Sequence, residues 1–260
     1  MQTITAVIPA RNEENNITRC IESAKWCNKI IVMWMGNDKT GIIAKKMGAE
    51  VVKMNSSEKD NFIGVQKNIN WVIDHCTTDW ILRVDADEVV TDKLQKEILS
   101  LLTIHYSLQI TNSPIAYGIP RVQYFWGGFL KGGDWAYDRL VRLFQPKYCR
   151  YHPIVPVHEQ FTVKGTIGYL KNKLLHYSHP TLKDAVKKFQ VYTDIEAAHL
   201  QIAKFQAFWN LIFQPPYVFL RWTIWHHGYR DGIRGIIAGA FRGWYEFLLY
   251  KKYLFKKSKN

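Results

Sequence analysis

Residues 4–84 alternate short apolar runs with segments whose apolar side chains recur at helical spacing. The apolar runs predict strands at 4–10, 30–35, 50–54 and 80–84, and the segments between them predict helices near 17–24, 42–47 and 69–76. Such alternation favours an α/β fold, with a mostly parallel sheet covered by flanking helices. Ligands of such sheets bind beyond the carboxyl ends of the strands, so the residues that follow each strand form the candidate site.

The strand predicted at 80–84 is followed at once by three carboxylates, those of Asp85, Asp87 and Glu88. Like charges this close repel one another, and each loses hydration when it is buried. A divalent cation would relieve both costs, because Mg²⁺ and Mn²⁺ favour carboxylate oxygens. The alternative is an acidic surface turn that leads into a helix capped by Thr91.

The composition fits one globular domain, with or without an appendage. The chain has 260 residues, and 47% of them are hydrophobic, which excludes a disordered protein. Its four cysteines form no C-x-x-C pair and no zinc pattern, so we expect free thiols in a reducing compartment. The apolar run after Met1 is too short for a secretory signal. We therefore expect a cytoplasmic protein.

The net charge of +13 is concentrated toward the C-terminus, where residues 215–260 hold nine Lys or Arg against two Asp or Glu. Trp, Phe and Tyr side chains are interleaved with these cations. The combination fits an anionic membrane surface or a nucleic acid, and the chain carries none of the usual nucleic-acid motifs. We therefore expect a peripheral protein on the inner face of the cell membrane, without a nucleic-acid partner.

The C-terminal region is expected to be helical and membrane-associated. Residues 205–220 are apolar, but Pro215-Pro216 is expected to stop a helix, and sixteen residues are too few for a comfortable span. Apolar residues between 233 and 248 predict either an amphipathic helix at the membrane interface or a helix packed on the rest of the protein. We therefore divide the chain into an α/β domain at 1–204 and a basic, aromatic-rich helical region at 205–260.

Several short motifs stand in order along the chain. They are residues 6–14 (AVIPARNEE), 36–40 (GNDKT), 66–68 (QKN), 84–88 (VDADE), 157–159 (VHE), 176–178 (HYS) and 228–235 (GYRDGIRG). Together they resemble family 2 glycosyltransferases, which have the GT-A fold. The later motifs resemble one bacterial branch, the lipopolysaccharide-core β-1,4-glucosyltransferase-like proteins. The resemblance covers nearly the whole chain and implies that residues 1–204 form a GT-A glycosyltransferase domain.

The resemblance implies a nucleotide-sugar donor and a metal ion. The residues it points to for the donor are Pro9, Ala10, Arg11, Glu13, Asp38, Lys67, Asn68, Asp85 and Arg142. Those it points to for Mn²⁺ or Mg²⁺ are Asp87, Asp85, His176 and His158. Such an ion acts as a Lewis acid that stabilises the charge of the departing diphosphate. The basic side chains could instead form ordinary surface salt bridges, and the histidines could be hydrogen-bonded core residues.

The expected reaction is an inverting transfer of a hexose from a nucleotide sugar, UDP-linked, to a hydroxyl of a lipid-linked saccharide or lipopolysaccharide core. The acceptor hydroxyl loses its proton as it attacks the anomeric carbon, so a carboxylate must act as general base. Glu159 is the first candidate, with Asp134 and Glu88 as competitors, and Asp87 completes the expected catalytic pair. A structural salt bridge is the alternative role of Glu159.

The chain departs from the family at the end of the second predicted strand. Family members usually carry an acidic residue there that contacts uracil, whereas this chain has Met33. A methionine cannot accept the N–H hydrogen bond of the base as a carboxylate does. Either Asp38 or a backbone carbonyl takes over this contact, or recognition of the base is loosened.

Three other functions compete with this interpretation. A polyprenyl-phosphate glycosyltransferase would use a phosphate acceptor and need no strong base. A nucleotidyltransferase would need a glycine-rich phosphate loop near the N-terminus, and residues 9–13 (PARNE) contain no glycine. A non-catalytic nucleotide-sugar-binding relative would keep the fold, and Met33 leaves that option open.

Overall fold

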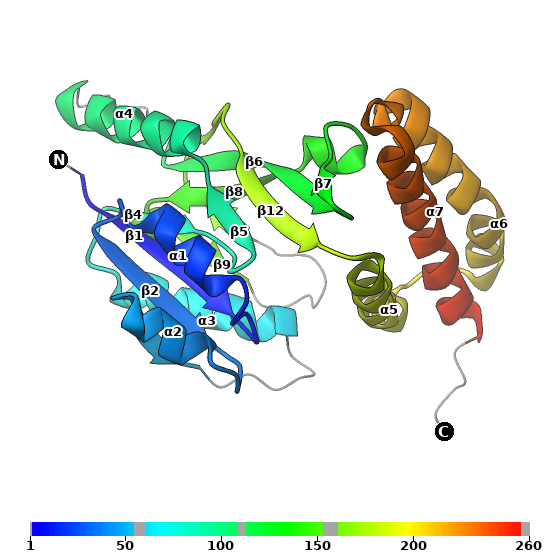
Figure 1. Cartoon of the computed structure of the whole chain (residues 1–260), viewed down its shortest axis with the longest axis horizontal. Helices are drawn as coiled ribbons and strands as arrows, with labels where there is room; N and C mark the ends of the chain where they lie inside the picture. The colour runs from blue at the N-terminus through cyan, green and yellow to red at the C-terminus, as the bar shows by residue number, and fades with distance from the viewer. Residues whose placement is uncertain (1, 55–60, 109–112, 153–160, 256–260) are drawn as a thin grey trace. The chain divides into compact units, whose positions relative to one another are not determined.

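The computed structural model describes residues 2–54, 61–108, 113–152 and 161–255. The chain forms two compact units, which we call unit 1 and unit 2 (Figure 1). Unit 1 comprises residues 1–121 and 139–176, and unit 2 comprises residues 122–138 and 177–260.

The order of elements follows the alternation that the sequence predicts (Figure 1). The strands are β1 (Ile4–Ala10), β2 (Lys29–Trp34), β3 (Glu50–Lys53), β4 (Trp80–Arg83), β5 (Glu88–Val90), β6 (Ala116–Phe125), β7 (Gly128–Phe129), β8 (Arg139–Phe144), β9 (Cys149–Tyr151), β10 (Phe161–Val163), β11 (Ile167–Tyr169) and β12 (Leu174–His179). The helices are α1 (Ile17–Ala24), α2 (Thr40–Lys46), α3 (Asn61–His75), α4 (Asp92–Leu108), α5 (Leu182–His199), α6 (Lys204–Leu220) and α7 (Gly232–Phe255).

Parallel pairing joins β3, β2, β1 and β4, in that order across the sheet. All seven residues of β1 are buried, because helices cover both of its faces. Ile8 packs with Ile17 of α1 in one core cluster, whereas Val7 packs with Ile69 of α3 in another. The predicted α/β fold, a mostly parallel sheet with flanking helices, is confirmed.

Antiparallel strands extend this sheet beyond β4. Strand β8 pairs with both β4 and β6, and β12 pairs with β5 so that His176 lies opposite Glu88. This pairing matters for the site, because β5 begins directly after the acidic loop. It brings a histidine of the late sequence next to carboxylates that precede it by almost ninety residues.

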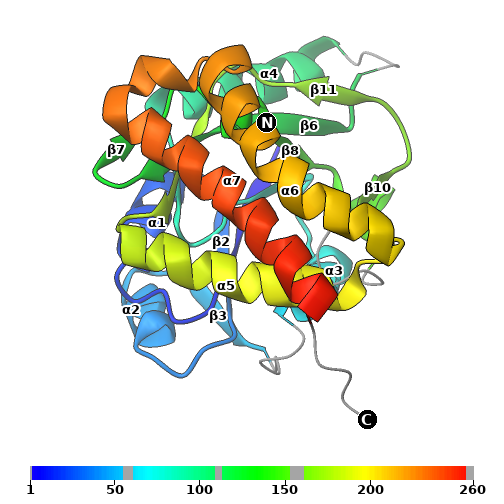
Figure 2. The same cartoon turned by 90° about the vertical axis from the view of Figure 1, so that its right-hand side faces the viewer.

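Unit 2 contains the α5, α6 and α7 helices, and α6 corrects one prediction from the sequence. Helix α6 continues through Pro215 and Pro216, which were expected to stop it. Each proline removes one intrahelical hydrogen bond, and a π-helical turn at Arg221–Trp225 follows the helix. Packing against α7 compensates: the Pro215 carbonyl lies so near Gly243 that an added Cβ would approach it to 2.8 Å (Figure 2).

The segment before α7 is held in unit 2 by polar contacts. The Asp231 carboxylate accepts hydrogen bonds from the backbone N–H groups of Lys131 and Gly132, at 2.9 to 3.0 Å. The buried Trp222 donates its indole N–H to the Gly235 carbonyl at 2.9 Å. Within the described ranges, no helix combines the length and hydropathy needed to cross a membrane.

Candidate active site

The acidic loop between β4 and β5 is a tight turn whose carboxylates have different surroundings. The Glu88 N–H donates to the Asp85 carbonyl at 2.8 Å, and the Glu88 carboxylate accepts from the Asp85 N–H at 2.9 Å. The Glu88 side chain is completely buried, whereas that of Asp85 is 25% exposed. The fold thus gives these two carboxylates different environments.

Three arginines, two of them buried, neutralise most of this loop. Arg142 donates to both oxygens of Asp85, at 3.2 and 2.5 Å, and to Glu88 at 3.3 Å. Arg83 donates to Asp85 at 3.1 Å, and Arg121 donates to Glu88 at 3.1 Å. Burial would raise the pKa of Asp85, but the charges of Arg142 and Arg83 hold that pKa well below its usual range.

Asp87 faces a different partner. Its Oδ2 lies 3.2 Å from Nε2 of His176, and both side chains are partly exposed. The histidine Nδ1 is buried and has no hydrogen-bond partner among the described residues. The structure therefore brings together two of the four residues predicted to bind metal, with Asp85 two residues before Asp87. The fourth, His158, lies outside the described residues.

The loops after β1 and β2 are joined by hydrogen bonds. The Asp38 carboxylate accepts from the Glu14 N–H at 3.1 Å and from the Thr40 hydroxyl at 2.7 Å. The Thr40 hydroxyl in turn accepts from the Glu13 N–H at 2.9 Å. Burial would raise the pKa of Asp38, but these hydrogen bonds with Thr40 and Glu14 lower it overall. Asp38 is thus an ionised carboxylate that holds the two loops together.

The remaining predicted donor residues fall into three settings. Pro9 and Ala10 are buried at the end of β1, and Arg11 is partly exposed just after it. Lys67 is exposed on α3, and Asn68, beside it, has a buried amide nitrogen without a partner among the described residues. All of these residues lie in unit 1, and their role in binding the donor stays a prediction.

Gln66 is a residue that the sequence-based list of site residues omits. It is fully buried, and neither its amide oxygen nor its amide nitrogen has a hydrogen-bond partner among the described residues. A buried amide without partners is costly, so a water molecule or ligand is expected to satisfy it. A glutamine three residues before Ile69, on the buried face of α3, is the signal that could have identified it.

The candidates for the general base also differ in their surroundings. Glu88 is enclosed by arginines, as described above, and Asp134 in unit 2 pairs with Arg221. Glu159 lies outside the described residues.

Met33 is fully buried in the core cluster that contains Val7 and Ile69, so its side chain takes a packing role.

Arg142 and Arg139, three residues apart on β8, have opposite environments. Arg142 is 1% exposed and contacts the acidic loop, whereas Arg139 is exposed above the Tyr169 ring. The contacts of Arg142 identify it as a structural partner of Asp85 and Glu88. Its predicted role in binding the donor diphosphate stays a prediction.

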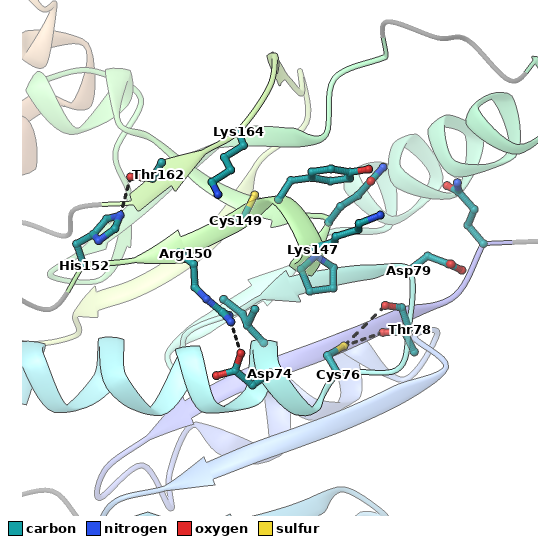
Figure 3. A pocket seen from close by; sticks show the side chains of 15 residues that line it. Asp74, Cys76, Thr78, Asp79, Lys147, Cys149, Arg150, His152, Thr162 and Lys164 are labelled. Atoms are coloured by element: carbon teal, nitrogen blue, oxygen red, sulfur yellow. Dashed lines mark hydrogen bonds and ion pairs between the residues drawn. The ribbon is translucent and has the colours of Figure 1, made fainter.

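A cavity of about 850 Å³ lies in unit 1 at the opposite edge of the sheet (Figure 3). It is lined from the end of α3, the residues before β4, residues between 145 and 152, and Thr162 and Lys164. Arg150 pairs there with Asp74, and Lys147 and Lys164 also line it. These residues stand at the amino end of β4, so this cavity is separate from the acidic loop at the carboxyl end.

Comparison with known proteins identifies the family of this chain. The glycosyl transferase family 2 model matches residues 5–140, slightly more than half of the chain. The chain therefore belongs to glycosyl transferase family 2, and it is a glycosyltransferase. The family that the sequence motifs predict is confirmed.

The relatives of this chain include named bacterial proteins. The lipopolysaccharide core biosynthesis glycosyltransferase LpsC of Rhizobium meliloti (strain 1021) is 25% identical over 266 residues, covering 99% of this chain and 95% of that protein. An uncharacterised glycosyltransferase of Rickettsia typhi is 27% identical over 211 residues, covering 77% of this chain and 68% of that protein. The crystal structure of S. aureus TarS 1-349 in complex with UDP is 12% identical, with a TM-score of 0.49 over 99% of this chain and 93% of that chain. A likeness as weak as the last decides nothing about ligands.

Proposed function

We propose that this glycosyltransferase transfers a hexose from a UDP-linked sugar to a hydroxyl of a lipid-linked saccharide or lipopolysaccharide core, with inversion at the anomeric carbon. The observation that carries the proposal is the approach of Asp87 to His176, at 3.2 Å, beside an acidic loop that arginines hold in place. The named activity of LpsC supports the choice of acceptor. An acceptor of this kind places the enzyme at the inner face of the cell membrane.

The donor set at this loop fits a divalent cation. Two ligands bonded to one ion at about 2.0–2.2 Å stand roughly 3 Å apart, close to the separation of the Asp87 oxygen and the His176 nitrogen. The described residues contain no group of three metal-binding side chains, so water and the diphosphate oxygens would fill the other positions. Asp87 and His176 would hold Mn²⁺ or Mg²⁺, with Asp85 and His158 as the further predicted ligands. The bound ion supplies Lewis-acid stabilisation of the departing diphosphate.

The other residues of the chain would bind and orient the substrates. The loops joined by Asp38 and Thr40 would enclose the nucleotide, with Arg11 and Glu13 on the same rim. The exposed Lys67 would meet the diphosphate charge. Arg142 would act indirectly, since it fixes the orientation of Asp85.

We also propose the division of the chain into a GT-A domain at 1–204 and a membrane-associated region at 205–260.

A thermal-shift screen of sugar nucleotides in the presence of Mn²⁺ tests the proposal directly. A donor at a hundredfold its dissociation constant contributes about 2.7 kcal/mol of stability, which raises Tm by about 5–10 °C for a chain of this length. The same donor with a chelator in place of Mn²⁺ should give a much smaller shift. Absence of a shift with every sugar nucleotide tested contradicts the proposed donor class.

The Glu159→Gln variant tests the general base. The variant should bind the donor as well as the wild type does, and its transfer to a hydroxyl acceptor should fall by about 10²–10⁴-fold, because the amide cannot accept the proton. Steady-state kcat and the donor Kd, measured on the same preparation, separate these effects. Transfer that survives the substitution would show that Glu159 is not the base and would favour a phosphate acceptor.

A further inference from the structure

One side of α6 exposes large apolar side chains to solvent. Apart from two adjacent pairs, they recur at steps of three and four residues, the spacing of a single helical face, and each is 44–72% exposed. We call this set the α6 face: Phe205, Phe208, Trp209, Ile212, Phe213, Tyr217 and Leu220. Ile224 and Trp225 continue it beyond the end of the helix, at 59% and 67% exposed.

The opposite side of α6 is already covered. Ala207 and Val218 are buried, and the helix lies beside α7, where the Pro215 carbonyl approaches Gly243 (Figure 2). Helix α7 therefore packs on the side of α6 opposite to the α6 face and does not cover that face. A helix that is apolar on both sides is normally buried or lies against lipid, and soluble monomers rarely expose an apolar patch of this size.

The charges around the α6 face indicate which kind of partner fits it. Helix α6 contains no acidic residue, begins at Lys204 and is followed directly by Arg221. Two acidic residues occur between 204 and 255, and both are bound, Asp231 by backbone N–H groups and Glu246 by Arg242 at 3.2 Å. A second copy of this chain would bring like charges together at such a face. A surface with negative charge and an apolar interior fits both properties.

We propose that the α6 face inserts into the boundary between headgroups and acyl chains of an anionic lipid bilayer. Seventeen helical residues extend about 25 Å, and such a helix would lie in the plane of the membrane. Trp209 and Tyr217 are side chains that favour the headgroup level. The biological purpose of this contact rests on the proposed function, because a lipid-linked acceptor is presented at the same surface.

This assignment narrows the membrane contact, expected for residues 205–260 as a whole, to one face of α6. Sequence periodicity at 233–248, within α7, predicts either an interfacial helix or a helix packed on the rest of the protein. In the structure, Ala238, Leu248 and Leu249 of α7 are buried, and α7 packs against α5 and α6. The α6 face at 205–220 exposes seven large apolar side chains, against the four of α7, which are Ile233, Ile236, Phe247 and Phe255.

Vesicle co-sedimentation of the full chain tests the proposal. The wild type should bind vesicles of phosphatidylglycerol and phosphatidylcholine, with binding that weakens as salt is raised, and should bind pure phosphatidylcholine less well. The double variant Trp209→Gln with Phe213→Gln should lower the partition coefficient at least about tenfold, because two large apolar side chains no longer leave water. The double variant Phe205→Gln with Phe208→Gln, one turn earlier, should give a comparable loss.

A matched control removes an exposed tryptophan and an exposed isoleucine from unit 1. Trp71 and Ile42 are 42% and 56% exposed, so Trp71→Gln with Ile42→Gln makes a similar chemical change on another surface. This control should bind vesicles within about twofold of the wild type. Hydrolysis of a soluble sugar nucleotide without vesicles should be unchanged in the α6 variants, which shows that they are folded.

The outcomes separate this proposal from the proposed function. Vesicle binding by the wild type that the α6 variants retain in full overturns the α6 assignment, even if sugar transfer is observed. Loss of binding in α6 variants that keep the melting temperature of the wild type supports the assignment, even if no sugar nucleotide is ever turned over. A wild type that sediments as a dimer, ignores vesicles and becomes monomeric in the α6 variants also overturns it, since a second copy then covers the face.

Discussion

Replacement of Asp87 by asparagine is expected to lower kcat of sugar transfer by about 10²–10³-fold. The amide keeps the size of the side chain but loses the negative charge that would hold a cation beside His176, 3.2 Å away. The diphosphate would then depart without Lewis-acid stabilisation. The measurement is the initial rate of transfer across a range of Mn²⁺ concentrations, together with the melting temperature without ligands.

The matched control for this substitution is Asp74→Asn. Asp74 is a surface aspartate in the same unit that pairs with Arg150 at the opposite edge of the sheet. Its loss should leave kcat and the Mn²⁺ dependence near those of the wild type, since it lies outside the acidic loop. If Asp87→Asn keeps both the rate and the Mn²⁺ dependence of the wild type, the ion is not held at this loop.

Replacement of Arg142 by methionine is expected to destabilise the protein by about 3–5 kcal/mol. The substitution keeps a long side chain but removes the charge that Asp85 and Glu88 share, at 2.5 and 3.3 Å. Glu88 is completely buried, so it cannot recover this loss from water. Urea denaturation at neutral pH gives the free energy of unfolding for wild type and variant.

Arg139→Met, three residues earlier on the same strand, is the control for Arg142→Met. Arg139 is exposed and its described contact is with the Tyr169 ring, so its loss should cost less than about 1 kcal/mol. An Arg142→Met variant that keeps its stability but loses donor affinity would contradict the structural role. It would support the diphosphate contact that the sequence suggests.

The ion pair of Asp85 with Arg142 predicts that the stability of the protein depends on pH. The charges of Arg142 and Arg83 more than offset the effect of burial, so the pKa of Asp85 in the folded state lies below its unfolded value of about 4. A lowered carboxylate pKa stabilises the folded state above the unfolded pKa, and this contribution is lost as pH falls toward the folded pKa. The stability difference between wild type and Arg142→Met should therefore be full near pH 7 and shrink below about pH 5.

The sequence predicts the first half of the fold well, for a simple physical reason. Strands such as β1 and helices such as α1 are buried on a regular period, so the pattern of apolar residues contains their boundaries. Because the carboxyl ends of parallel strands lie at the same edge of a sheet, the sequence also predicts that Asp38 and Asp85 share one rim. Family motifs supply the chemistry that periodicity cannot.

The parts that sequence reasoning misses depend on contacts between distant residues. Arg142 reaches Asp85 across 57 positions of sequence, and no local pattern marks that pairing. Helix α6 persists through Pro215 because α7 packs against it, which is a tertiary effect that overrides propensity. The helical spacing of Gln66 and Ile69 indicates that Gln66 is buried, but that its amide has no hydrogen-bond partner among the described residues is known only from the structure.

The arginines around the acidic loop give the candidate site a definite shape. Arg83, Arg121 and Arg142 offset the charges of Asp85 and Glu88, so these carboxylates do not need a cation to lie close together. A preorganised corner loses little conformational freedom when a ligand arrives, and more of the contact energy then remains as affinity. The cation and the nucleotide would therefore meet a rigid receptor, one that need not be assembled anew in each turnover.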